Sequence, residues 1–153
     1  MKYHTIGAFK GVQNIPYCKA SVDMKVGMGV ILDRVNELVN LPASEDEAKA
    51  CYYIVTNIND KPEIHFSSEV GNVLKGEHVR ADDLTSVANL EIEFGASEIT
   101  TAFEELAAGD KLVFGTDGKL VKSDAVDGYK VYFDVIALTP YMGKGVRAMI
   151  CVQ

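Results

Sequence analysis

A glycine-rich stretch that carries a lysine is the first place where this sequence could bind a phosphate. The stretch GDKLVFGTDGKLVK runs from Gly109 to Lys122. A phosphate-binding loop of the Walker type needs a Gly, four further residues, and then Gly-Lys followed by Ser or Thr. Leu120 follows Gly118-Lys119 here, and Val113 stands where the first glycine is required. Two of the four required residues are missing, so the stretch does not predict a phosphate site.

The same stretch is typical of a β-hairpin. Apolar and polar residues alternate on both sides of Asp117-Gly118, and this dipeptide readily adopts the positive φ angles of a tight turn between two strands. We therefore expect a hairpin that turns at Asp117-Gly118, with Lys119 as a solvated residue of the returning strand.

Two further glycines, Gly27 and Gly29 in VGMGVIL, partly match a dinucleotide-binding fingerprint. That fingerprint needs a third glycine and a helix that begins beneath the pyrophosphate. Leu32 stands at the third position, and the residues after it do not predict a helix. A strand that contains two glycines is the better interpretation.

The remaining residues with chemical potential are isolated from one another. His4, His65 and His78 have no cysteine or second histidine at zinc-ligand spacing. No G-x-S-x-G elbow is present, so a nucleophilic triad would have to be assembled in space. The acidic segments SEDE, ADD and FEEL suit caps, turns and solvated faces. We expect no catalytic residue, no metal site and no cofactor.

Length and composition favour one ordinary globular domain. The 153 residues are 48% hydrophobic and 24% charged, and a chain of this size buries roughly two-thirds of its unfolded surface. The longest apolar runs, such as Val30-Ile31-Leu32, are far shorter than the roughly 18 residues of a membrane-spanning helix. The first residues lack the apolar core of a signal peptide, so we expect an intracellular origin and no membrane partner.

Charge and cysteine content narrow the function further. The net charge of −7 opposes nucleic-acid binding, which needs clustered Lys and Arg. Cys18, Cys51 and Cys151 are an odd number of cysteines without a C-x-x-C pair, so at least one thiol is unpaired and small buried thiols are expected.

Strand patterns recur along most of the chain. SVDMKVGMGV places Val22, Met24, Val26, Met28 and Val30 on one face, which predicts a single half-buried strand. Further strands are predicted in CYYIVTNIND, near Val79, in NLEIEF, in GYKVYFDVIALT and in VRAMICVQ. DRVNELVNLP is ambiguous between a helical stripe and a turn with a strand, and we favour the turn and strand.

Two helices are predicted, and both are short. Ser44 lies three residues before Glu47, the spacing of a capping box, and one or two helical turns should follow. In SEITTAFEELAAG, Ile99, Phe103 and Leu106 have near-helical spacing, and Gly109 ends the segment.

The predicted fold is mainly β: a single-domain antiparallel β-barrel or sandwich with one or two short helices. Residues 1–19 lack a steady period and are predicted to be an extended N-terminal arm that orders against a partner. Residues 20–153 form the β-rich domain. Seven tyrosines and no recognisable catalytic motif favour a binding or structural protein, because Tyr suits partly wet interfaces.

Several segments, taken in their order and spacing, resemble a known class of virion protein. They are VGMGVILD, LPAS, YYIVTNINDKPEI, KGEHVRADDL, AAGDKLVFGTDGKLVK and YKVYFDVIALT. Across residues 20 to 138 the chain resembles the head decoration proteins of tailed bacteriophages, also described as cement or capsid-stabilising proteins.

The resemblance implies a structural protein of the virion without enzymatic activity, made in the host bacterial cytoplasm. Such proteins bind the outer surface of the expanded capsid, often as trimers, and tie neighbouring major capsid proteins together. The implied partners are the major capsid protein and further copies of this chain. We expect the capsid contacts in the arm and in exposed loops, at Met1, Tyr3, Phe9, Tyr17, Asn59, Lys61 and Glu63.

Two alternatives stay open. One is another virion component with the same β-rich build, such as a tail or head-fibre attachment module. The other is a small ligand-binding β-barrel or an enzyme whose site is assembled in space, which a deep cleft with converging Asp, Glu or His groups would favour.

Overall fold

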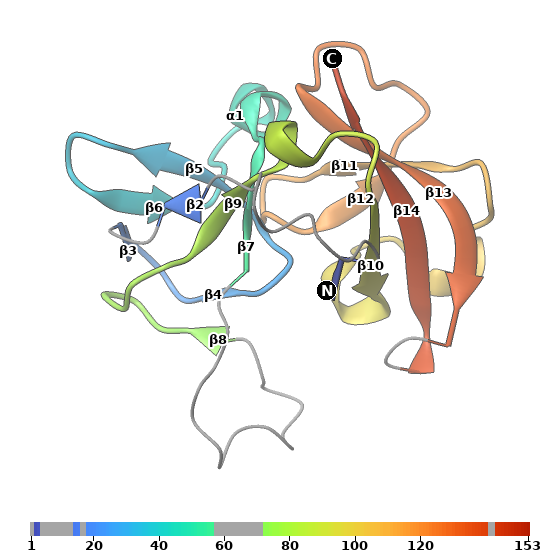
Figure 1. The fold of residues 1–153 in the computed structure, drawn as a ribbon, viewed down its shortest axis with the longest axis horizontal. Helices are drawn as coiled ribbons and strands as arrows, with labels where there is room; N and C mark the ends of the chain where they lie inside the picture. Colours follow the sequence, from blue (N-terminus) through green and yellow to red (C-terminus); the bar gives the residue numbers. More distant parts are fainter. Residues whose placement is uncertain (1, 4–13, 16–17, 57–71, 141–142) are drawn as a thin grey trace.

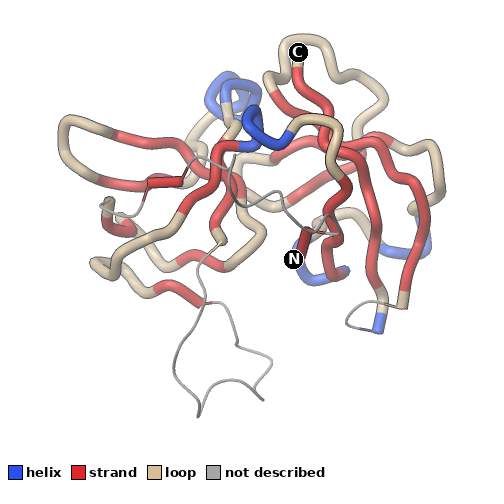
Figure 2. The backbone as a smooth tube through the Cα atoms, viewed as in Figure 1, coloured by secondary structure: helices blue, strands red, loops and turns tan. Residues whose placement is uncertain are grey.

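Where the structure describes it, the chain folds mainly into β-strands, which form two six-stranded sheets and one two-stranded ribbon (Figure 1). The computed structural model describes residues 2–3, 14–15, 18–56, 72–140 and 143–153. The two sheets lie side by side, and the helices are short (Figure 2). The predicted mainly β class is confirmed.

The C-terminal sheet consists of antiparallel strands in the order β1-β10-β14-β13-β11-β12. Its strands are β1 (Lys2–Tyr3), β10 (Glu91–Gly95), β11 (Lys111–Phe114), β12 (Leu120–Lys122), β13 (Val131–Thr139) and β14 (Gly145–Val152). The alternation predicted for β13 is confirmed, since Val131, Phe133 and Val135 are buried and the residues between them are partly exposed. A β-bulge between Val135 and Ala137 ends this alternation.

The predicted hairpin is β11–β12, paired from Leu112↔Lys122 to Phe114↔Leu120. Its turn is longer than a two-residue turn. Gly115 N–H donates to the Lys119 carbonyl at 2.7 Å, and Gly118 N–H donates to the Gly115 carbonyl at 3.0 Å. Gly118 has a φ of 76°, as the sequence predicts, but Lys119 belongs to the turn and not to the returning strand.

The N-terminal sheet has the order β2-β9-β7-β5-β6-β3. Its strands are β2 (Asn14–Ile15), β3 (Lys19–Ala20), β5 (Gly29–Asp33), β6 (Leu38–Asn40), β7 (Tyr53–Val55) and β9 (Ala81–Asp83). All its pairs are antiparallel except β3–β6. The turn and strand favoured for DRVNELVNLP are confirmed as the β5–β6 hairpin. The ribbon pairs β4 (Met24–Lys25) with β8 (Asn72–Val73).

The N-terminal sheet curls until its edge strand β3 meets the segment that leads into β9. Lys19 forms an isolated antiparallel bridge with His78. Val79 N–H donates to the Cys18 carbonyl, and Ala20 N–H donates to the Glu77 carbonyl, both at 2.9 Å. This half is therefore barrel-like. The boundary predicted between residues 19 and 20 falls within β3.

Strand β7 serves two hydrophobic cores because its side chains alternate between its two faces. Ile54 packs into the core of the C-terminal sheet, together with Cys51 just before the strand. Tyr53 and Val55 pack into the core enclosed by the curled N-terminal sheet. The predicted strand CYYIVTNIND is thus confirmed, but it is buried on both faces and not on one.

Two glycines join the sheets directly. Gly29 N–H, in β5, donates to the Gly118 carbonyl of the β11–β12 turn at 2.7 Å. A Cβ on Gly29 would lie 2.4 Å from the Phe114 ring, and a Cβ on Gly118 would lie 2.7 Å from the Gly29 carbonyl oxygen. Only residues without a side chain allow this approach.

The single strand predicted across Val22 to Val30 is wrong. The segment divides into β4 and β5, with a turn between them at Gly27, whose φ is 93°. Gly27 N–H donates to the Val55 carbonyl, and a Cβ on Gly27 would lie 2.9 Å from Glu98 Cδ. A long-range contact therefore breaks a pattern whose local period is that of one strand.

The helix predicted in residues 97–109 is also wrong. The segment contains two 3₁₀ turns, Ala96–Glu98 and Phe103–Glu105. Between them Ile99 forms a parallel bridge with Leu120, and the Thr101 hydroxyl accepts the N–H of Lys122 at 2.9 Å. Pairing with the edge strand β12 replaces the intrahelical hydrogen bonds, while Ile99 and Leu106 are still buried as the pattern predicts.

The predicted helix after Ser44 is α1 (Glu45–Ala50). Ser44 Oγ accepts the Glu47 N–H at 3.3 Å, and Glu47 Oε2 accepts the Ala43 N–H at 2.7 Å. The Ser44 side chain therefore satisfies an N–H group that the first helical turn leaves free, and the Glu47 side chain binds back to the residue before the cap.

Three acidic side chains are buried, and two of them belong to the segment ADD, which suits caps, turns and solvated faces in the sequence. Asp82 and Asp83 of β9 and Glu93 of β10 are at most 9% exposed. Asp83 caps the 3₁₀ helix Leu84–Val87 by accepting the Thr85 N–H at 2.9 Å. The strand expected near Val79 lies slightly later, at Ala81–Asp83.

Candidate interaction surface

The structure describes only one of the sequence-predicted contact residues. Tyr3 lies in β1, where its backbone is in register with Ile92 of β10. The other six predicted residues lie outside the described residues: Met1, Phe9, Tyr17, Asn59, Lys61 and Glu63. The candidate surface is therefore built from other residues.

The β5–β6 hairpin extends outward from the rest of the N-terminal half, and its tip is residues 33–37 (Figure 1). The Asp33 carboxylate organises this tip. Its Oδ1 accepts the N–H groups of Val35 at 3.1 Å and of Asn36 at 3.0 Å, and its Oδ2 accepts the Asn36 side-chain amide at 2.7 Å. These hydrogen bonds, first the one from the Asn36 side chain, lower the pKa of Asp33. The carboxylate is therefore ionised at neutral pH and fixes the turn.

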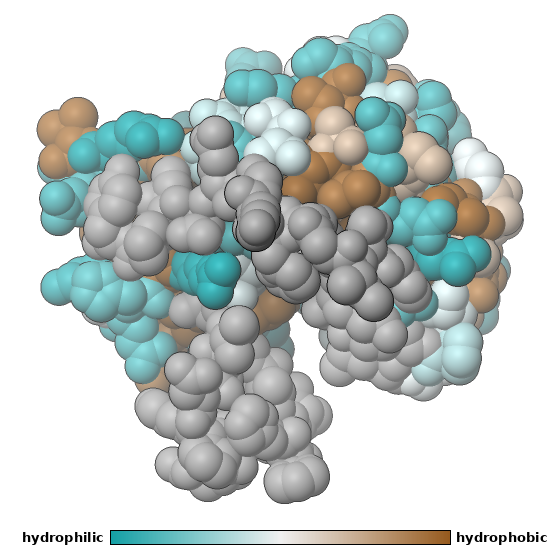
Figure 3. Space-filling view, viewed as in Figure 1, coloured by the Kyte–Doolittle hydropathy of each residue, from teal (hydrophilic) through white to brown (hydrophobic). Residues whose placement is uncertain are grey.

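The tip presents an apolar side chain to solvent. Val35 is 91% exposed, more than any other large hydrophobic residue in the described ranges. A hydrophobic area lies at the outer end of the hairpin, next to hydrophilic atoms (Figure 3). Beside it, Arg34 Nη2 donates to the Tyr53 hydroxyl at 3.1 Å and so connects the tip with the N-terminal core. Burial raises the pKa of Tyr53 to about 12, so its hydroxyl stays neutral.

The tip also contains local backbone strain. Glu37 has a φ of 54°, in the left-handed region. Such a conformation costs a non-glycine residue about 1 kcal/mol. Among the described residues, Asn89 is the other non-glycine residue with positive φ, and Asn tolerates this region better than Glu.

A shallow depression of about 480 Å³ lies between α1, residues 128–130 and Gln153. Lys130 Nζ is 3.6 Å from the centre of the Tyr52 ring, and Lys49 Nζ is 2.9 Å from Glu45 Oε1. Glu45 raises the pKa of Lys49. Both ammonium groups already have partners, which weakens this depression as an anion site.

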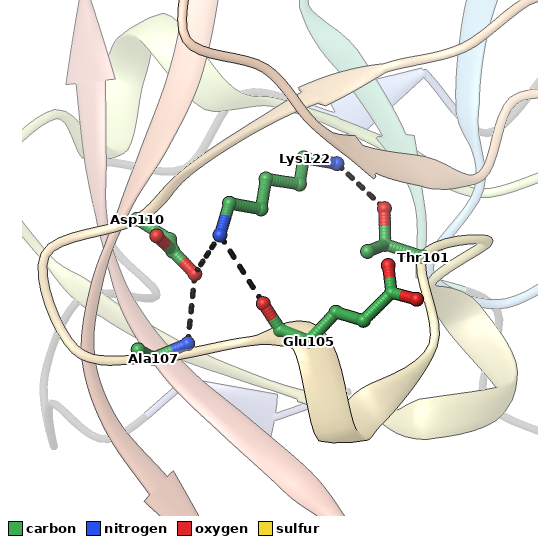
Figure 4. A network of polar contacts seen from close by, with 5 residues as sticks. All are labelled: Thr101, Glu105, Ala107, Asp110 and Lys122. Carbon is green, nitrogen blue, oxygen red and sulfur yellow. Dashed lines mark hydrogen bonds and ion pairs between the residues drawn. The ribbon is translucent and has the colours of Figure 1, made fainter.

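A second lysine network holds the segment before β11 against the β11–β12 hairpin (Figure 4). Lys122 Nζ is 2.9 Å from Asp110 Oδ2 and donates to the Glu105 carbonyl at 3.1 Å. Asp110 Oδ2 also accepts the Ala107 N–H at 2.7 Å. The Lys122 hydrogen bond, followed by that of Ala107, lowers the pKa of Asp110. Each polar group holds another part of the chain, so the network is structural.

The three cysteines are poorly suited to nucleophilic chemistry. Burial raises the pKa of Cys51 to about 12 and also raises that of Cys18. Cys151 is partly exposed, and burial together with Asp134, 3.4 Å away, raises its pKa. Thiols with raised pKa values stay protonated at neutral pH.

The residues that the structure describes contain no group of three or more His, Cys, Asp or Glu side chains placed to hold a metal ion. They also contain no helix with the length and apolar character needed to cross a membrane.

Sequence reasoning did not single out the hairpin tip as a candidate interaction surface. Its signal is the Asp33-to-Asn36 spacing, which suits an aspartate-centred turn, with an apolar Val35 inside that turn. Val35 instead entered the sequence interpretation as part of an ambiguous apolar stripe. Its exposure depends on where the hairpin points, which the local pattern does not state.

Comparisons with known proteins add no assignment: no protein-family model matches the chain, and no curated protein matches it.

Proposed function

We propose that this chain is a non-enzymatic structural protein of a tailed-phage virion, which binds the outer surface of the capsid and stabilises its lattice. The ordered sequence segments that resemble head decoration proteins are the starting point for this proposal. Its proposed partners are the major capsid protein and further copies of this chain, which would form a trimer, with no direct contact to nucleic acid.

The observation that carries this proposal is the β5–β6 hairpin, which extends from the packed body and ends in a nearly fully exposed Val35. A projecting element that a rigid body holds in one conformation can bind a partner at a low entropy cost. The body is held by two cores that share β7.

The net charge of the chain and the repetition of its contacts over a lattice are both consistent with a position on the outside of the shell. A net charge of −7 disfavours contact with packaged DNA. On a lattice, many modest contacts act together because each bound copy raises the effective concentration of its other contacts.

Co-sedimentation tests the proposal. Expanded shells are assembled from the proposed partner, the major capsid protein of the same virion, without any decoration protein, and mixed with the purified chain. We expect saturable binding with a fixed number of copies per shell, and bound shells that resist heat better than bare ones. Failure of the chain to sediment with these shells would exclude the capsid function and favour another virion component.

A further inference from the structure

We infer that the β5–β6 tip, residues 33–37, is a preformed contact element that inserts Val35 into a small apolar pocket of the capsid shell protein, with a cation at the pocket rim facing Glu37. This inference rests on the proposed function and specifies the chemistry of its contact.

Exposure alone does not mark Val35 as a contact, because single exposed apolar side chains are common on protein surfaces. Leu74 is also 55% exposed, for example. The second observation is the order of the turn around Val35. Three hydrogen bonds to the Asp33 carboxylate fix residues 33–36, and Arg34 connects the tip with Tyr53 of β7. A contact residue held in this way loses little conformational freedom on binding.

The backbone strain at Glu37 also supports a contact role for the tip. A glycine would adopt its φ of 54° without strain, and a turn that only connected two strands would gain from that replacement. Strained non-glycine residues are concentrated at functional sites. Glu37 instead keeps a carboxylate in the exposed tip, two residues after Val35.

The charge of the tip and the size of the Val35 side chain limit the kind of partner that can bind there. Glu37 and Asp33 give the tip two carboxylates against the one guanidinium of Arg34, so a nucleic acid or an anionic membrane would be repelled. One valine is too small to hold a protein on a lipid surface, where even a long acyl chain gives only marginal binding. A protein pocket that takes one branched side chain, with a Lys or Arg at its rim, matches both properties.

Binding of variants to the undecorated shells tests this inference. Val35→Ala should weaken binding about tenfold, because two buried carbon groups are lost. Val35→Asp should weaken it about a hundredfold, because a charge would enter an apolar pocket. Val35→Ile should stay within about threefold of the wild type. Leu74→Asp, a matched change at another exposed apolar residue, should bind as the wild type does. Urea unfolding of each variant checks that the fold is unchanged.

Glu37→Gln tests the cation at the rim. It should weaken binding about threefold at low salt and reduce the salt dependence of binding, as expected for one exposed ion pair. An unchanged salt dependence would overturn this part of the inference.

The outcomes separate the inference from the proposed function. If the wild type does not bind the shells, both fall. If the wild type binds and Val35→Asp binds equally well, the capsid function stands and the pocket contact is wrong. Sedimentation velocity of the free chain tests whether the partner is instead a second copy of this chain. If Val35→Asp dissociates an oligomer without weakening shell binding per copy, the pocket belongs to that second copy and the inference is overturned.

Discussion

The two halves of the molecule differ in the length of their strands and in the size of the side chains in their hydrophobic cores. In the C-terminal half, β13 and β14 have nine and eight residues, and Phe133 packs edge to face against Phe94 and Phe114 at 5.1 and 5.4 Å between ring centres. In the N-terminal half the strands have two to five residues. The buried members of the N-terminal core are mostly Val, Ala and Cys, with one Met and one Tyr. Large rings bury more apolar area per residue, so we expect most of the stability in the C-terminal half.

This difference assigns a separate role to each half: one contributes most of the stability, and the other presents the hairpin tip. The half with long strands provides the packed base, whereas the half with short strands carries the β5–β6 hairpin and its exposed Val35. Gly29 and Gly118 connect the two halves through a backbone hydrogen bond. A rigid base and a coupled hairpin can hold the tip in one orientation, which a preformed contact needs.

Phe133→Ala should have the largest effect on stability. Removing a fully buried ring that contacts two other rings leaves a cavity, and the free energy of unfolding should fall by about 3–5 kcal/mol. Urea denaturation followed by circular dichroism measures this loss. Val39→Ala, at a fully buried residue of the N-terminal core, is the control and should cost about 2 kcal/mol. Equal losses would mean that stability is not concentrated in the C-terminal half.

Gly118→Ala tests the connection between the halves. Its Cβ would lie 2.7 Å from the Gly29 carbonyl oxygen and 2.9 Å from Leu41 Cδ2. We expect a loss of about 3 kcal/mol, from the clash and from the positive φ together.

Gly76→Ala separates these two causes. Gly76 has a φ of 85°, close to that of Gly118, but no atom lies within 4 Å of its added Cβ. Only the backbone strain remains there, so the loss should be about 1 kcal/mol. Similar losses at both glycines would show that the packed junction contributes nothing beyond backbone conformation.

Asp110→Asn tests the lysine network within the C-terminal half. The folded state holds the pKa of Asp110 below its ordinary value, so the ionised carboxylate stabilises the protein at pH values above the unfolded pKa. This contribution is lost as the pH falls through the lower, folded pKa.

The difference in unfolding free energy between wild type and Asp110→Asn should be about 1 kcal/mol at pH 7 and shrink toward pH 3. Urea denaturation across this pH range measures the difference. A double-mutant cycle with Lys122→Met isolates the pair. A difference that does not change with pH would contradict the assigned ion pair.

Glu37→Gly should have the smallest effect and the opposite sign. Glycine relieves the strain at φ 54°, but it also increases the freedom of the unfolded chain, so a net gain of about 0.5 kcal/mol is expected. Glu37→Ala removes the carboxylate without relieving the strain and should be close to neutral. A clear loss of stability with glycine would mean that a stabilising effect of the Glu37 side chain, and not the proposed contact role, explains its presence in the tip.

Much of the fold follows from local patterns. The alternation in β13, the Asp117-Gly118 turn and the Ser44–Glu47 cap each depend on residues close together in the chain, and each was predicted. The division at Gly27 and the absence of an α-helix in residues 97–109 were not predicted, because contacts with distant residues break these local patterns. Gly27 N–H donates to the Val55 carbonyl, and Glu98 lies close enough to exclude a side chain at Gly27. Ile99 pairs with Leu120 of β12.

The sequence by itself determined the class of fold, the acidic surface charge and the positions of most strands and turns, because side-chain alternation and φ preferences act between neighbours. Only the tertiary structure decided that Gly29 and Gly118 form the joint between two sheets, that Asp82 is buried, and that Val35 is exposed at the end of a hairpin. The physical reason is that burial and close approach are properties of segments that meet only after the sheets have formed, and no local period encodes which segments those are.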